Sequence, residues 1–137
     1  MRKDKPILLV EDDEIDQMTV KRALNDIHVT NKLYVSCNGE EALEFLRDEG
    51  NQKPGIILLD INMPRMNGIE FLTEIKKDAE FKKIPVVVLT TSVEEQDKVD
   101  SFSLGVSGYM LKPVDYSQFV EVVRTIDLYW TLSESCD

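Results

Sequence analysis

Three stretches of this chain are uninterrupted runs of apolar residues, and polar residues follow each run at once. The runs cover residues 7–10, 56–59 and 85–89. A strand without a polar face suits a parallel sheet that helices cover on both sides. Residues 32–36 alternate instead between polar and apolar side chains, which predicts an edge strand with one solvent-exposed face. Residues 108–111 predict a short fifth strand.

Segments with helical spacing lie between the predicted strands. Capping residues mark where they begin: Asp13 and Asp115, the spaced pairs Asn38 with Glu41 and Ser92 with Glu95, and Asn67 with Gly68. Residues 79–83 are predicted to be a loop. Strand and helix alternate five times without an internal repeat. This pattern predicts an α/β fold with a doubly wound five-stranded parallel sheet and helices on both faces.

Length and charge narrow the functions that the chain can serve. Its 137 residues fit one domain over 1–137, with a core over about 6–130 and a tail at 131–137. The net charge of -10 disfavours binding to nucleic acid and to anionic membranes. The chain has neither a long apolar run nor a signal-peptide core near its start, so we predict a cytoplasmic protein.

Neither the cysteines nor the one histidine is predicted to carry chemistry. Cys37 and Cys136 lie far apart without metal-ligand spacing, and both are expected to be free thiols. His28 falls where a helical pattern breaks, so we expect a solvated loop residue without a functional role.

Polar side chains that suit phosphoryl chemistry stand at the carboxyl ends of the predicted strands. They are Glu11, Asp12, Asp60, Thr90 and Lys112. Because these ends meet at one edge of a parallel sheet, the three carboxylates would repel by roughly 3 kcal/mol per pair at about 5 Å and an effective dielectric near 20. A divalent cation with oxygen ligands, such as Mg²⁺, would compensate. Lys112 adds a positive charge, and Thr90 adds a hydroxyl that no helix cap requires.

In this order and spacing, the residues resemble the receiver domain of two-component response regulators. The resemblance covers residues 7 to about 130. It implies the flavodoxin-like strand order 2-1-3-4-5 and a signalling protein that catalyses only its own phosphorylation and dephosphorylation. The expected phosphoryl donors are a sensor histidine kinase, a histidine phosphotransfer protein or a small acyl phosphate.

The resemblance also implies a role for each residue of the site. Asp60 would be the phosphoacceptor, and Thr90 and Lys112 would hold phosphoryl oxygens. Asp12 would bind Mg²⁺ directly, Glu11 through water, and Asn62 through its backbone carbonyl. Tyr109 matches the aromatic residue that turns inward when the threonine moves to the phosphoryl group, so Thr90 and Tyr109 would form the conformational switch.

A narrower resemblance links the chain to stand-alone receivers that partner phytochrome-type histidine kinases. It rests on residues 62–66, 84–92 and 112–115, and on Gln118, Phe119 and Trp130. It implies a phytochrome-type kinase as the partner. A phosphorelay shuttle and a terminal output that binds a target both fit the sequence.

Two other classes with related folds fit less well. A flavodoxin-like FMN-binding protein needs a phosphate loop after the first strand, where this chain has three acidic residues. A phosphatase with an aspartate nucleophile would have a second acid two residues later, where this chain has Asn62.

Two further expectations concern the last third of the chain. The resemblance implies that the Lys112-Pro113 bond is cis. The physical motive is a tight turn directly after a buried strand, which must aim the Lys112 amine back over Asp60. The resemblance to phytochrome-partner receivers implies a homodimer through the fourth helix, the fifth strand and the final helix; the alternative is that Tyr129 and Trp130 fold back to cover the bottom of the domain. The apolar residues of the final helix exceed what one buried stripe needs. Together with Val99 and Phe102 of the fourth helix, the surplus residues are expected to form an exposed patch. The helix residues are Phe119, Val120, Val122, Val123, Ile126, Tyr129 and Trp130.

Overall fold

The computed structural model describes residues 5–26, 28–63, 65–115, 117–122 and 124. It contains a five-stranded parallel sheet in the order β2-β1-β3-β4-β5. The strands are β1 (Ile7–Val10), β2 (Leu33–Ser36), β3 (Ile56–Asp60), β4 (Val86–Thr90) and β5 (Gly108–Leu111). The predicted fold class and strand order are therefore confirmed.

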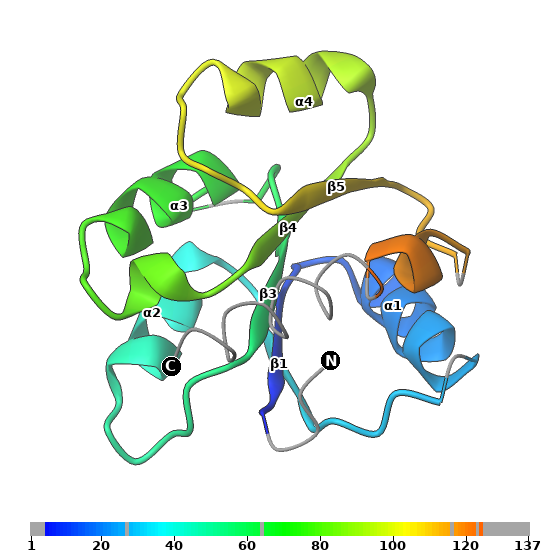
Figure 1. The fold of residues 1–137 in the computed structure, drawn as a ribbon, viewed down its shortest axis with the longest axis horizontal. Helices are drawn as coiled ribbons and strands as arrows, with labels where there is room; N and C mark the ends of the chain where they lie inside the picture. The colour runs from blue at the N-terminus through cyan, green and yellow to red at the C-terminus, as the bar shows by residue number, and fades with distance from the viewer. Residues whose placement is uncertain (1–4, 27, 64, 116, 123, 125–137) are drawn as a thin grey trace.

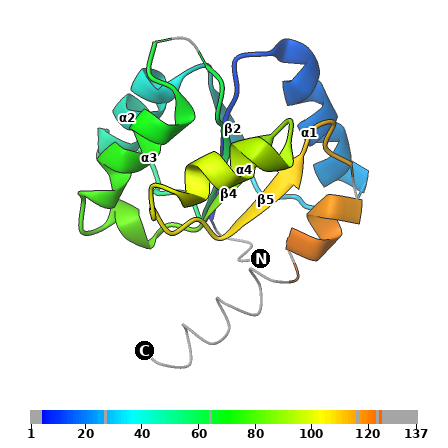
Figure 2. The ribbon, with the colours of Figure 1, turned by 90° about the horizontal axis from the view of Figure 1, so that it is seen from above.

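Helices cover both faces of the sheet. They are α1 (Glu14–Asp26), α2 (Gly39–Arg47), α3 (Gly68–Lys76), α4 (Val93–Asp100) and the helical residues 117–122. Figures 1 and 2 both show α2 and α3 on one face, with α1 and the helix at 117–122 on the other. Within the described residues, no helix is long and apolar enough to cross a membrane.

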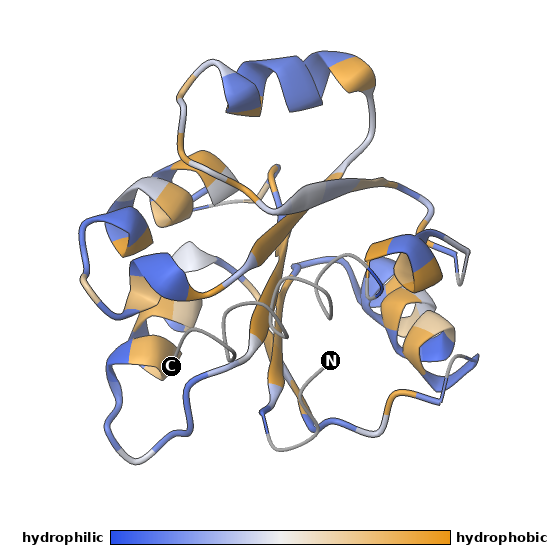
Figure 3. Cartoon of the chain, in the orientation of Figure 1, coloured by the Kyte–Doolittle hydropathy of each residue, from blue (hydrophilic) through white to orange (hydrophobic). Residues whose placement is uncertain are grey.

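Alternate side chains of each central strand feed two separate cores. In β1, Leu8 and Val10 pack into the core with α2 and α3, whereas Ile7 and Leu9 pack into the core with α1. This explains the uninterrupted apolar runs, since both sides of these strands are buried. Figure 3 shows the central strands coloured as hydrophobic, while the helices around them mix hydrophilic and hydrophobic residues. Among the described strands, β2 pairs with β1 alone, so its edge position is confirmed. The expected solvent-exposed face was wrong, because Tyr34 packs against the core under α2 and α3 and Ser36 is buried.

Capping interactions fix where the helices begin. The side chains of Asn38, Asn67 and Ser92 accept hydrogen bonds from the backbone N–H three residues later. The complete reciprocal capping box is at Asn67 and Glu70. Glu95 differs from the expected box, because its carboxylate accepts from the Thr91 N–H at 2.7 Å. Its side chain therefore faces the end of β4.

Several local features differ from the expectations. Residues Phe81–Lys83 form a short 3-10 helix within the predicted loop, and Phe81 packs into the core. Val99 is only 1% exposed, so the expectation that it belongs to an exposed patch was wrong. Phe102 is exposed but lies beyond the end of α4. Val122 is partly buried against the α1-side core, and residues 123, 126, 129 and 130 lie outside the described residues.

The turn after β5 is held by one side chain. The Gln118 amide accepts from the Leu111 N–H at 2.8 Å and donates to the Leu111 carbonyl at 3.0 Å and the Pro113 carbonyl at 3.3 Å. The Lys112-Pro113 bond between these contacts is cis, as predicted. The turn thus leads directly from the last strand to the helix at 117–122.

Gly68 lets α3 begin against the backbone that follows Asp60. A Cβ at this position would lie 2.6 Å from the Asp60 carbonyl oxygen and 2.8 Å from the Ile61 Cα. We expect Gly68→Ala to lower the free energy of unfolding by about 1–3 kcal/mol, because backbone must shift to admit the methyl group. Urea unfolding measures this. Gly108→Ala is the control, since its Cβ would meet nothing within 4 Å; equal losses in the two variants would contradict the close approach.

Candidate functional site

The strand ends bring the predicted residues to one edge of the sheet. Glu11 follows β1, Asp60 ends β3, Thr90 ends β4 and Lys112 follows β5. The register pairs Val10 with Leu59, Asp60 with Leu89 and Thr90 with Leu111, so no strand ends far from its neighbour. The sheet therefore gathers these side chains as the sequence predicted.

Three of the carboxylates form a compact cluster. Glu11, Asp12 and Asp60 each offer an oxygen, and these oxygens all lie within 4.8 Å of one another. Glu11 and Asp60 are buried, whereas Asp12 is exposed. The inner part of the cluster is thus buried, and its Asp12 side is open to solvent.

Lys112 supplies a cation to this cluster. Its Nζ lies 2.8 Å from Glu11 Oε1, 3.0 Å from Asp16 Oδ2 and 3.1 Å from Asp60 Oδ1. The Lys112 side chain is 15% exposed, so these pairs are largely shielded from solvent. Asp16 is not among the site residues predicted from the sequence. An acid in the first turn of a helix is common, and nothing in its spacing indicates that it faces the sheet edge.

Burial and neighbouring charges shift the pKa values of Glu11 and Lys112. Burial raises the pKa of Glu11, hydrogen bonding to Lys112 lowers it and the Asp60 charge raises it, with a net value of about 7. Burial lowers the pKa of Lys112. Hydrogen bonds to Glu11 and Asp16 and the charge of Asp60 outweigh this effect, so the net pKa lies above the ordinary value. Lys112 therefore stays positively charged at neutral pH, while Glu11 titrates near it.

The raised pKa of Glu11 predicts how pH affects the metal-free protein. Between pH 4.5 and about 7, the folded protein holds a proton on Glu11 that the unfolded chain has released. The free energy of unfolding should fall as pH rises through this window, because the folded state binds more protons. Urea unfolding in excess chelator at several pH values measures the slope. Glu11→Gln should reduce it, and an unchanged slope would contradict the assignment.

The donor set fits a hard divalent cation. The cluster offers carboxylate oxygens only, which is the chemistry that Mg²⁺ binds. Its three ionised carboxylates would exceed the charge of Lys112 by two, which one divalent cation offsets. The Asn62 N–H donates to Asp60 Oδ1 at 3.3 Å, so the backbone of Asn62 also lies beside the cluster.

The two residues predicted to form a switch, Thr90 in β4 and Tyr109 in β5, both contact side chains or backbone of α4. Thr90 is buried, and its hydroxyl lies 3.4 Å from Gln96 Nε2. The Tyr109 hydroxyl contacts the Asp100 carboxylate and lies 3.5 Å from the Gln96 carbonyl. Burial, then hydrogen bonding to Asp100, raises the pKa of Tyr109. Sequence reasoning missed Gln96 and Asp100, since a polar residue on a polar helix gives no sign of its partner.

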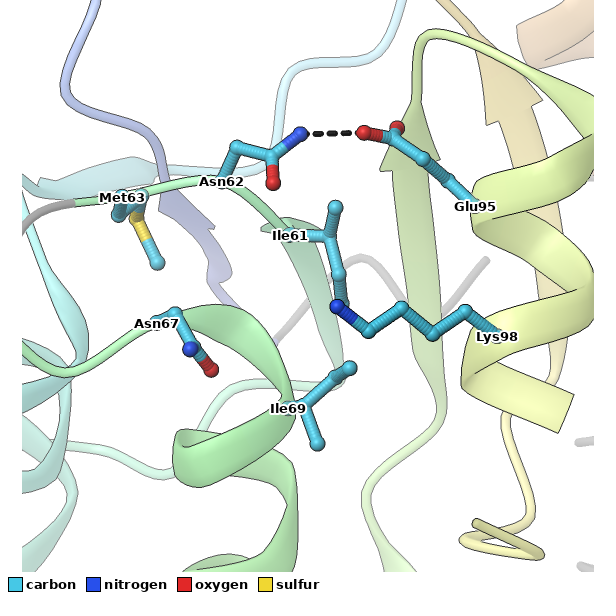
Figure 4. A pocket seen from close by; sticks show the side chains of 7 residues that line it. All are labelled: Ile61, Asn62, Met63, Asn67, Ile69, Glu95 and Lys98. Carbon is cyan, nitrogen blue, oxygen red and sulfur yellow. Dashed lines mark hydrogen bonds between the residues drawn. The ribbon is translucent and has the colours of Figure 1, made fainter. Parts of the chain in front are cut away.

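A small pocket adjoins the site between α3 and α4. Its volume is about 320 Å³, and it is lined by Ile61, Asn62, Met63, Asn67, Ile69, Glu95 and Lys98. Figure 4 shows Asn62 and Glu95 joined by a hydrogen bond across it, with the Lys98 side chain reaching over from α4. Asn62 thus links the loop after β3 to α4 by its side chain, while its backbone contacts Asp60.

A parallel sheet of this order, with acids after the first and third strands, threonine after the fourth and lysine after the fifth, defines a receiver domain. Residues 7–124 match the model of the family described as "Response regulator receiver domain", and the chain belongs to that family. The resemblance seen in the sequence is thereby confirmed.

Three relatives are similar over most of their length. Response regulator Rcp1 of Synechocystis is 38% identical over 92% of this chain and 88% of its own. Its Mn²⁺-bound structure has a TM-score of 0.73, covering 92% and 94% of the two chains. The bacteriophytochrome response regulator RtBRR is 40% identical with a TM-score of 0.84, covering 90% and 78%. The phosphorylated cyanobacterial phytochrome response regulator RcpA is 39% identical with a TM-score of 0.74, covering 93% and 94%.

Proposed function

We propose that Asp60 accepts a phosphoryl group from a phosphohistidine in a Mg²⁺-dependent reaction. The observation that carries this proposal is the Lys112 ammonium, held 3.1 Å from Asp60 Oδ1 within a cluster of three carboxylates. Similarity to a phosphorylated and a Mn²⁺-bound response regulator supports it. The protein would be a signalling protein whose only chemistry is its own phosphorylation and dephosphorylation.

In the proposed reaction, an Asp60 carboxylate oxygen forms a bond to phosphorus while the phosphorus–nitrogen bond of the donor breaks. The electron pair of that bond stays on the donor imidazole, which then takes up a proton. Lys112 binds a phosphoryl oxygen, and the Asn62 N–H keeps the Asp60 carboxylate oriented. Mg²⁺, held by Asp12, Asp60, the Asn62 carbonyl and Glu11 through water, would neutralise charge on the phosphoryl oxygens.

The proposed response to phosphorylation runs through α4. The Thr90 hydroxyl would leave Gln96 and donate to a phosphoryl oxygen, which removes one contact between β4 and α4. Tyr109 would then leave Asp100 and turn inward. The signal would reach a partner as a change on the face formed by α4 and β5.

Exposed apolar residues support two partner surfaces. Ile15 and Met18 of α1 are 73% and 60% exposed beside the site, where a histidine kinase or a histidine phosphotransfer protein would dock. Similarity to bacteriophytochrome response regulators supports a phytochrome-type kinase. Val93, Phe102 and Leu111 are exposed on or next to α4 and β5, which supports the proposed homodimer through this face and the final helix.

Sedimentation of a Phe102→Asp, Leu111→Asp variant tests the dimer: it should sediment as a monomer where the wild type does not.

The proposed function is tested by incubating the protein with a small acyl phosphate and measuring its intact mass. With Mg²⁺, the protein should gain the mass of one phosphate; in excess chelator it should gain none, because the carboxylates repel an anionic donor. Equal labelling in both conditions would refute the metal requirement. No labelling in either, with a donor that labels another receiver, would refute the phosphoacceptor role.

A further inference from the structure

Asp16 contacts the site without having a place in the proposed reaction. It lies in the first turn of α1, and its Oδ2 is 3.0 Å from Lys112 Nζ. Its side chain is 31% exposed, whereas those of Glu11 and Asp60 are 0% and 5% exposed. Asp16 is therefore the most solvent-exposed of the three carboxylates that contact Lys112.

The start of α1 holds Asp16 in this position. The Asp13 side chain accepts from the Asp16 N–H at 3.0 Å, which fixes the first turn of the helix. The Gln17 side chain donates to the Glu11 carbonyl at 2.7 Å and ties that turn to the end of β1. The contact between Asp16 and Lys112 thus joins two anchored segments.

Three carboxylates surround the Lys112 ammonium, and its contact with Asp16 has hydrogen-bond geometry. Glu11, Asp16 and Asp60 each lie 2.8 to 3.1 Å from Nζ. A phosphoryl oxygen that binds this ammonium must therefore compete with the Asp16 hydrogen bond and with the attraction of the two buried carboxylates.

The three carboxylates differ in what happens to their charge during phosphorylation. Glu11 belongs to the cluster that a divalent cation would neutralise, and the Asp60 carboxylate becomes an acyl phosphate. Asp16 lies outside that cluster, and Lys112 is its only ion-pair partner among the described residues. The Asp16 charge therefore persists beside the phosphoryl group and keeps attracting the same ammonium.

We propose that Asp16 is a positioning residue that competes with the phosphoryl group for Lys112, and so weakens the site's hold on phosphoryl oxygens. The proposal rests on the proposed function. It makes Asp16 a residue that sets how readily the site is occupied, without contact with the phosphorus.

The test uses beryllium fluoride, which mimics a phosphoryl group on a carboxylate without a covalent reaction. Calorimetric titration of the Mg²⁺-loaded protein gives its affinity. Asp16→Asn keeps the size of the side chain and removes its charge, and should bind the probe about three- to tenfold more tightly, as expected for one partly exposed charge. Glu14→Gln is the matched control: it removes the same charge from the same helical turn, where Glu14 is exposed and outside the cluster. Its affinity should change by less than about twofold.

Titration with Mg²⁺ alone separates this effect from a loosened structure. Removing a negative charge can only weaken cation binding, so Asp16→Asn should bind Mg²⁺ no more tightly than the wild type while binding the fluoride complex more tightly. Equal changes in both variants, or weaker fluoride binding in Asp16→Asn, would overturn the proposal. A wild type that binds no beryllium fluoride with Mg²⁺ would instead refute the proposed function itself.

Discussion

Replacing Asp60 with Asn should leave the protein folded but unable to gain phosphate from an acyl phosphate. An amide lacks the carboxylate oxygen that attacks phosphorus, and the substitution also removes one oxygen ligand from the cluster. We expect a complete loss of the added mass. Asp26→Asn, at the exposed end of α1, removes the same charge far from the strand ends and should be labelled like the wild type.

The fold of the Asp60 variant serves as an internal check. The Asp60 charge raises the pKa of Glu11, so the variant should have a lower Glu11 pKa and relieved repulsion within the cluster. Its free energy of unfolding in chelator should be no lower than that of the wild type. Phosphate found on the folded variant would show that another carboxylate is the acceptor.

Replacing Lys112 with Met should produce the largest loss of stability among the site variants. Lys112 is the cation beside Glu11, which is 0% exposed, and the same ammonium contacts Asp60. Removing one partner of a buried ion pair leaves the other uncompensated, which typically costs about 3–5 kcal/mol. Proton uptake by Glu11 limits this loss, so we expect about 3 kcal/mol in excess chelator near neutral pH.

Mg²⁺ should restore much of the unfolding free energy that Lys112→Met loses. This dependence on metal links the loss to the carboxylate cluster. Mg²⁺ would place two positive charges where the ammonium is missing, so the difference in unfolding free energy between variant and wild type should shrink in Mg²⁺. Lys77→Met is the control. Its pair with Glu74 spans 3.2 Å, but the two side chains are 68% and 38% exposed, so the loss should stay under about 1 kcal/mol. A Lys112 variant as stable as this control would show that the buried carboxylates do not need the cation.

The fold was largely predictable because its central strands are buried on both faces. That burial leaves uninterrupted apolar runs, whose ends mark the site edge of the sheet. Side chains at the strand ends, such as Asp60, Thr90 and Lys112, could be placed together because parallel strands share one carboxyl edge.

Helix residues of the site could not be found in the same way. Whether Asp16, Gln96 or Asp100 faces the site depends on how a helix is rotated against the sheet, and polar residues carry no periodic signal of that rotation. Val99 shows the related error. It is the one buried residue of a polar helix and packs α4 against the core, although its spacing in the sequence favoured a place on the surface.

The Gln118 contacts with Leu111 have a consequence for association between copies. Among the described strands β5 pairs with β4 alone, and an unpaired strand edge is where sheets of different molecules can join into aggregates. Here an amide side chain occupies both backbone groups of Leu111 as a further strand would. Another strand cannot pair with Leu111 while these contacts hold, so Gln118 protects this end of the β5 edge from sheet extension between molecules.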